Sequence, residues 1–173
     1  RKTVTQLAKS YPDVALEFLY IDNAAMQMIL NPKQFDVILT GNMFGDIISD
    51  EASVIGGSIG LLPSASVGKS HAMFEPIHGS YPQATGKNIA NPIAAILSAG
   101  MLLEHFNLHD EAEAIKVSVE KSINVGITTP DLGEKHANMT TSKVGDFIAD
   151  IISNPDDTNY NFSNINLGQS TII

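Results

Sequence analysis

The chain has 173 residues, of which 43% are hydrophobic and 17% are charged, a balance typical of a soluble globular protein. Nineteen acidic residues against ten basic ones give a net charge of −9, which argues against nucleic acid or an anionic membrane as a partner. Because the chain has no cysteine, a disulfide framework and thiolate catalysis are excluded. No apolar run reaches the roughly 20 residues that span a bilayer, and no signal peptide is visible, so we expect a cytoplasmic protein.

The first part of the chain alternates between helical and extended patterns. A helix is predicted over 1–11, where Pro12 ends it, and a second helix over 24–30. Bulky residues predict strands over 14–20 and 35–40, and another helix follows from about Gly45. Strands that alternate with helices predict an α/β fold with a parallel, layered sheet and flanking helices.

Three aspartates in this part are candidate site residues. Asp46 and Asp50 are four residues apart, so on a helix their carboxylates project from one face, and such oxygen ligands suit Mg²⁺ or Mn²⁺. The alternative is a solvated acidic face that interacts with the helix dipole. Asp22 follows the first predicted strand, and ligands collect at the carboxyl ends of parallel strands. The alternative for Asp22 is a turn or N-cap residue.

The middle of the chain is rich in glycine and serine. The stretch 56–68 is predicted to be a loop, and no GxGxxG dinucleotide fingerprint follows a strand. Asn91 is suited to cap the next helix, with Pro92 at its first position.

Three helices are predicted in the last part of the chain. The first covers 93–106 and is apolar on most sides, which predicts burial, and the second covers 110–124. Ser142 is expected to cap the third helix, whose apolar stripe consists of Val144, Phe147, Ile148, Ile151 and Ile152.

Three longer segments carry a family resemblance. They read NMFGDIISD over 42–50, GLLPSAS over 60–66 and MFEPIHGSYPQATGKNIANP over 73–92. In content and order they closely resemble the isocitrate/isopropylmalate dehydrogenases, which are metal-dependent β-decarboxylating dehydrogenases. The resemblance is dense from 13 to about 131, and it implies the C-terminal half of that family's layered α/β fold.

The resemblance implies the roles of the candidate residues. Asp46 and Asp50 of one subunit and Asp22 of the other would bind Mg²⁺ or Mn²⁺ in a homodimer. Asp22 and Asp46 would also act in catalysis, and Asp22 would bind the substrate. The loop over 75–91 would hold NAD without the usual fingerprint. The implied cofactor contacts are Glu75, His78, Gly79, Ser80, Tyr81, Pro82, Gln83, Ala84, Thr85, Gly86, Lys87, Asn88, Ile89, Ala90, Asn91 and Asp131.

Gln83 departs from the common pattern of the family. Many NAD-dependent relatives have an aspartate there, which accepts hydrogen bonds from the ribose hydroxyls and repels the phosphate of NADP. NADP-dependent relatives have a lysine and a tyrosine at the positions of Gln83 and Ala84, and this chain has neither. We therefore expect NAD, with weaker discrimination against NADP, to which the nearby Lys87 contributes.

The segments 42–50 and 60–66 match the isopropylmalate branch of the family. This implies oxidative decarboxylation of the small molecule 3-isopropylmalate to a 2-oxo acid in leucine biosynthesis. The alternatives are an isocitrate, homoisocitrate or tartrate dehydrogenase, or a non-catalytic metal-binding or nucleotide-binding module.

The resemblance also implies how the chain divides. Residues 1–55 would belong to the dimerisation and metal-binding domain, 56–155 to the cofactor-binding domain, and 156–173 to a flexible tail. The family's catalytic lysine and tyrosine, and its substrate-binding arginines, have no counterpart here. We therefore expect this chain alone to be inactive.

Overall fold

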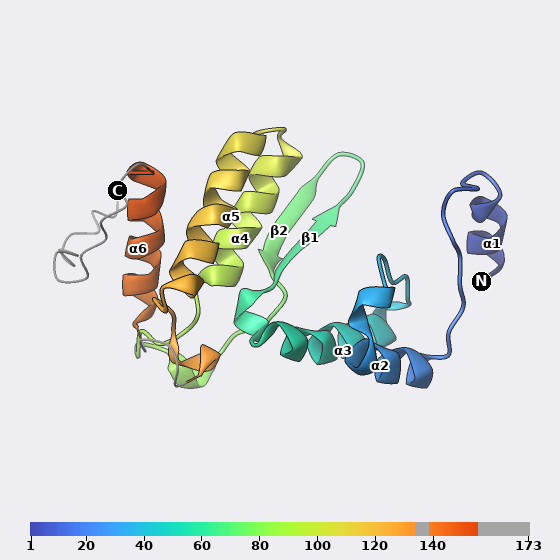
Figure 1. Cartoon of the computed structure of the whole chain (residues 1–173), viewed down its shortest axis with the longest axis horizontal. Coiled ribbons are helices and arrows are strands. Elements are labelled where there is room, and N and C mark those ends of the chain that lie inside the picture. The colour runs from blue at the N-terminus through green and yellow to red at the C-terminus, as the bar shows by residue number, and fades with distance from the viewer. Residues whose placement is uncertain (134–138, 156–173) are drawn as a thin grey trace. The chain divides into compact units, whose positions relative to one another are not determined.

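A computed structural model describes residues 1–133 and 139–155, so the predicted tail over 156–173 lies outside the described residues. The chain divides into two compact units, Arg1–Ala52 and Ser53–Ile173 (Figure 1). Each unit has its own buried residues, and the two are described separately below.

The first unit is built from three helices. Helix α1 covers Lys2–Ala8, α2 covers Ile21–Leu30 and α3 covers Asn42–Ser53, with a 3-10 turn at Pro32–Gln34. Ala24 and Met28 of α2 pack with Ile48 of α3 in a small buried cluster. Both of the predicted longer helices are therefore confirmed, although each begins three residues before its predicted start.

The two strands predicted in this unit are wrong. Neither 14–20 nor 35–40 is a strand, and in the described part of the chain the only paired strands lie in the second unit. A strand is stable only when a neighbour binds its backbone N–H and C=O groups, and bulky side chains do not supply that neighbour. The predicted parallel sheet is accordingly not formed by these two segments.

The second unit contains an antiparallel hairpin that the sequence pattern did not predict. Strand β1 covers Pro63–Val67 and β2 covers Ala72–Pro76, with Pro63 opposite Pro76 and Val67 opposite Ala72. The prediction of a loop over 56–68 is therefore wrong for its last part. Short serine and alanine residues are weak strand formers, and pairing with β2 overrides this preference.

Three helices pack beside the hairpin (Figure 1). Helix α4 covers Ile93–His105 and contacts both strands, α5 covers His109–Asn124 and contacts α4, and α6 covers Thr141–Ser153 and contacts α5. Their shared core consists of Ile93, Val119, Val144 and Ile148. These three helices lie where the sequence predicted them.

Two details of the predicted helices need correction. Thr140, and not Ser142, caps α6, because its side chain accepts a hydrogen bond from the Lys143 N–H. Ile152 is 41% exposed, so the buried stripe of α6 ends at Ile151. Helix α4 is less buried than expected, since Leu102 is exposed at its outer face. In the described residues, no helix is long and apolar enough to cross a membrane.

Candidate cofactor and metal site residues

The candidate metal ligands lie on the exposed surface of the first unit. Asp46 and Asp50 are one turn apart on α3, and both are exposed. Oδ2 of Asp46 accepts a hydrogen bond of 3.2 Å from Nδ2 of Asn42 in the turn before it. The helical spacing that sequence reasoning assumed for the two carboxylates is therefore present.

Asp22 does not follow a strand, as the sequence predicted, but lies in the first turn of α2. Its Oδ1 accepts a hydrogen bond of 2.7 Å from the N–H of Asn23, and the side chain is exposed. The prediction that Asp22 acts across a dimer concerns a second subunit, so it stays a prediction.

The donor chemistry of α3 fits a divalent cation in part. Two carboxylates on one helix face are hard oxygen ligands of the kind that Mg²⁺ and Mn²⁺ take. Across residues 1–133 and 139–155, no three His, Cys, Asp or Glu side chains come together as a complete metal site. Asp46 and Asp50 therefore supply two ligands, and further ligands would have to come from outside this chain.

The predicted cofactor loop begins at the end of β2, where Glu75 pairs with Ser64. Beyond it, almost every residue over 79–90 is exposed, while Ala84 is buried at 8% exposure in a 3-10 turn. Gln83 lies in the same turn, and its side chain is open to solvent. Nδ1 of His78 lies 3.0 Å from the carbonyl oxygen of Gly79, which accounts for one polar contact of that ring. Most of the loop is thus accessible to a ligand.

The last part of this loop is fastened to the N-terminus of α6. Asn88 has a positive φ of 55°, and its Oδ1 accepts hydrogen bonds of 3.1 Å from both the N–H and the hydroxyl of Ser142. The Thr141 N–H donates to the carbonyl of Asn88 at 3.0 Å, and its hydroxyl donates to the carbonyl of Ala90 at 2.5 Å. These bonds hold 88–90 in one conformation against a helix more than fifty residues away.

Asp131 connects three separate segments of the second unit. Its Oδ2 accepts a short hydrogen bond from the hydroxyl of Ser58 and a 3.0 Å bond from Nδ2 of Asn91. Its Oδ1 accepts a 2.6 Å bond from the hydroxyl of Thr129. The hydroxyl of Ser58 in turn accepts from the N–H of Gly60 at 3.1 Å. We call Ser58, Asn91, Thr129 and Asp131 the Asp131 network.

The network lowers the pKa of the Asp131 carboxyl. Partial burial acts in the opposite direction and raises the pKa, because desolvation disfavours the charged form. Hydrogen bonds from Ser58, Thr129 and Asn91, and from the backbone, favour the carboxylate and outweigh that effect. Asp131 is therefore ionised near neutral pH, as an acceptor of hydrogen bonds only.

Asn91 is positioned from both sides of its amide. Its Oδ1 accepts a 2.9 Å hydrogen bond from the N–H of Ile93, at the start of α4, which confirms the predicted capping interaction. Pro92 precedes the first helical residue instead of occupying it, a shift of one position. Gly60 lies so close that a Cβ there would be 2.8 Å from Cβ of Asn91. Only glycine leaves room for this side chain.

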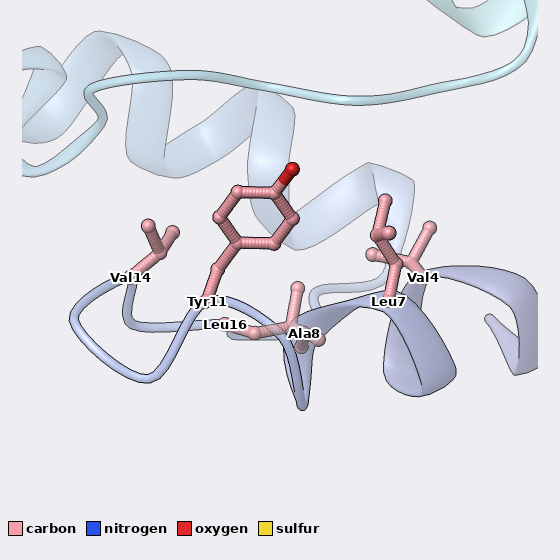
Figure 2. Close-up of a pocket in the computed structure, with 6 residues that line it drawn as sticks. All are labelled: Val4, Leu7, Ala8, Tyr11, Val14 and Leu16. Carbon is pink, nitrogen blue, oxygen red and sulfur yellow. The ribbon is translucent and has the colours of Figure 1, made fainter.

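The structure also contains a small pocket in the first unit, of about 150 Å³. It is lined by Val4, Leu7, Ala8, Tyr11, Val14 and Leu16, and Figure 2 shows these side chains on α1 and the segment that follows it. The lining is apolar apart from the Tyr11 hydroxyl, whereas a site for a nucleotide or a dicarboxylate needs several polar groups. This pocket is therefore not the candidate site.

Sequence reasoning missed the residues that support the candidate loop. Ser58, Thr129, Thr141 and Ser142 each bond to a predicted cofactor-loop residue or to Asp131. The only local signal was the Thr-Thr-Ser run over 140–142, which predicts a helix cap but no partner for it.

The family was identified by comparison with known proteins. Residues 1–148 match the family model described as isocitrate/isopropylmalate dehydrogenase. Because this match covers most of the chain, the chain belongs to the isocitrate/isopropylmalate dehydrogenase family.

Two similar relatives are named 3-isopropylmalate dehydrogenase. The protein of Wolinella succinogenes is 56% identical over 152 residues, and that of Thermotoga maritima is 55% identical over 150 residues. In both cases the match covers 86% of this chain and 42% of the relative. The chain thus spans less than half the length of these relatives.

Solved structures agree on the fold. Isocitrate dehydrogenase from Methylococcus capsulatus matches with a TM-score of 0.83 and 38% identity, over 87% of this chain and 44% of that one. A β-decarboxylating dehydrogenase from Thermococcus kodakarensis matches with a TM-score of 0.76 and 38% identity, over 88% and 45%. The predicted family fold, and the fact that the chain corresponds to part of it, are therefore confirmed.

Proposed function

We propose that a full-length protein containing this chain is a 3-isopropylmalate dehydrogenase, which oxidises and decarboxylates 3-isopropylmalate with NAD in leucine biosynthesis. The observation that carries the proposal is the identity of 50–56% with several proteins of that name. The solved isocitrate dehydrogenase is only 38% identical, which favours the isopropylmalate branch. We also propose a cytoplasmic location, in keeping with a biosynthetic enzyme.

In this proposal, Asp46 and Asp50 bind a divalent cation, together with Asp22 from the second subunit of a homodimer. The bound cation would supply Lewis acidity at the hydroxyl and carboxylate oxygens of the substrate. The spacing and exposure of Asp46 and Asp50 on α3 support this role. Their negative charges, one turn apart, repel each other, and a cation between them relieves that repulsion.

The homodimer has its own support in the first unit. Met43, Phe44 and Ile47 of α3 are 63%, 43% and 60% exposed, and they lie beside the two candidate ligands. Large apolar side chains that gather on one surface typically mark a protein interface. A dimer formed through this surface would bring the second subunit close to Asp46 and Asp50.

The loop over 75–91 holds NAD in this proposal. Gly79 and Gly86 lack a Cβ, so their backbone can approach a ligand closely, and Gly86 has a positive φ of 74°. Gln83 is exposed and free of charge, so it can hydrogen-bond a ribose hydroxyl without repelling a phosphate. The preference for NAD over NADP would accordingly be weaker than that of an aspartate at this position.

The proposal is tested by NADH formation in the full-length protein with Mg²⁺ or Mn²⁺, when 3-isopropylmalate and isocitrate are offered separately. We expect metal-dependent turnover of 3-isopropylmalate, a loss of at least about a hundredfold in Asp50→Asn, and little change in the matched control Asp110→Asn on the surface of α5. Preference for isocitrate would instead support the alternative that the solved neighbour suggests. Binding of NADH without any turnover would indicate a non-catalytic module.

A further inference from the structure

The orientation of the Asn91 side chain is determined by its two neighbours. Its oxygen faces the N–H of Ile93, and its nitrogen faces the carboxylate of Asp131. In the flipped orientation, the amide NH₂ would face another donor, and the amide oxygen would face an ionised carboxylate. Both contacts would be repulsive, so this amide cannot exchange its nitrogen and oxygen ends.

Asp131 is itself held in place. Ser58 donates to the same carboxylate oxygen as Asn91, and Thr129 donates to the other oxygen at 2.6 Å. With one bond to each carboxylate oxygen from a different segment, the carboxylate plane has little freedom to rotate. Ser58 is further held by the Gly60 N–H.

The Asn91 amide keeps hydrogen-bonding capacity beyond these contacts. An amide has two N–H groups and two oxygen lone pairs, and the network uses one of each. What remains is a donor and an acceptor in a fixed order. Adenine presents an amino donor next to a ring-nitrogen acceptor, and an amide can match this pair. Hypoxanthine has a carbonyl oxygen in place of the amino group, so the same amide meets it in the wrong order.

We propose that the Asp131 network fixes the Asn91 amide and thereby makes the cofactor site selective for adenine over a base whose amino group is replaced by a carbonyl. Asp131 and Ser58 are positioning residues in this scheme, and neither needs to touch the cofactor. This differs from the expectation that Asp131 is itself a cofactor contact. The inference rests on the proposed binding of NAD by the loop over 75–91.

The test compares NAD with nicotinamide hypoxanthine dinucleotide in the full-length protein. Affinities of the two reduced dinucleotides are measured by fluorescence, and kcat/KM is measured for the oxidised forms with 3-isopropylmalate. We expect the wild-type protein to prefer NAD by about tenfold, the usual discrimination of a well-placed amide contact. In Asp131→Ala this preference should fall close to one, because the amide is then free to flip toward the carbonyl of hypoxanthine.

Two further variants separate positioning from mere structural support. Asp131→Asn should retain most of the preference, because its amide oxygen can still accept from Asn91 while its NH₂ faces the Thr129 hydroxyl, which can act as an acceptor. Ser58→Ala should lower the preference by less than Asp131→Ala, and the control Ser70→Ala, in the exposed turn between β1 and β2, should leave it unchanged. The double variant Asn91→Ala/Asp131→Ala should show the same preference as Asn91→Ala alone.

Three outcomes would overturn the inference. The first is a wild-type protein that binds both dinucleotides equally, and the second is an Asp131→Ala variant that keeps the wild-type preference. The third is an equal loss of affinity for both dinucleotides, which would mean that Asp131 contacts a part of the cofactor they share. Failure of the proposed function has a different signature, since NADH would bind with adenine preference while 3-isopropylmalate is not turned over.

Discussion

Substitution of Gly60 by alanine tests the close packing around Asn91. Gly60 is buried, and its φ is not positive, so the backbone itself accepts alanine. The added Cβ would lie 2.8 Å from Cβ of Asn91 and 3.1 Å from its Cγ and Nδ2. Carbon atoms in ordinary contact are at least about 3.5 Å apart, so Asn91 or the turn must move by about 0.7 Å.

The magnitude follows from two opposing effects. Forcing a methyl group into a packed site costs about 1–3 kcal/mol. Replacing glycine by alanine also removes freedom from the unfolded chain, which stabilises the folded state by about 0.4–1 kcal/mol. We therefore expect Gly60→Ala to lower the free energy of unfolding by about 1–2 kcal/mol.

The assay is urea-induced unfolding of the full-length protein, followed by far-ultraviolet circular dichroism. Gly56→Ala is the matched control, because a Cβ at Gly56 would meet nothing within 4 Å and its φ is not positive either. The control should be neutral or slightly stabilised. If Gly60→Ala and Gly56→Ala unfold at the same urea concentration, the steric argument is refuted.

Three further predictions concern the bonds that hold the candidate loop. The pKa of Asp131, measured by carbon-13 NMR, should lie below the ordinary value of about 3.9 and rise in Ser58→Ala. Because the folded-state pKa is lowered, the stability that Asp131 contributes is complete above about pH 4 and is lost as pH falls through the lower value, so the unfolding difference from Asp131→Ala should narrow in acid. Asn88→Ala should cost about 2 kcal/mol and Asn88→Gly about 1 kcal/mol, since only alanine opposes the positive φ while both lose the bond to α6. Thr140→Ala should cost about 1 kcal/mol in the same unfolding assay, and no change would show that the cap adds nothing.

The helices were predictable because their signals are local. The apolar spacing of α4, α5 and α6 lies within each helix, and the positive φ of Gly126 ends the α5 region, as its position in the sequence predicted. The exact cap of α6 was harder, because Thr140, Thr141 and Ser142 are all good capping residues. Only the structure shows that Thr140 is the cap and that the next two side chains bond to the loop.

Strands were predicted poorly in both directions. Bulky residues over 14–20 suggested a strand that is not formed, whereas the small residues over 63–67 form one. In both cases the deciding factor is a partner segment, which lies outside any local window. The family resemblance located the candidate residues despite these errors, because it depends on the order of residues and not on the assigned secondary structure.

The Asp131 network shows why a resemblance names site residues but not their supports. Ser58 and Asp131 are 73 residues apart, and Asn91 and Asp131 are 40 apart, so no pattern in the sequence connects them. Each residue alone suggests something ordinary, such as a turn serine, a helix cap or a loop acid. Their chemistry emerges only when the fold places three donors around one carboxylate. Asn91 illustrates the result, since the sequence assigned it two compatible roles, a cap and an adenine contact, and the structure adds the bond to Asp131 that would make the second role selective.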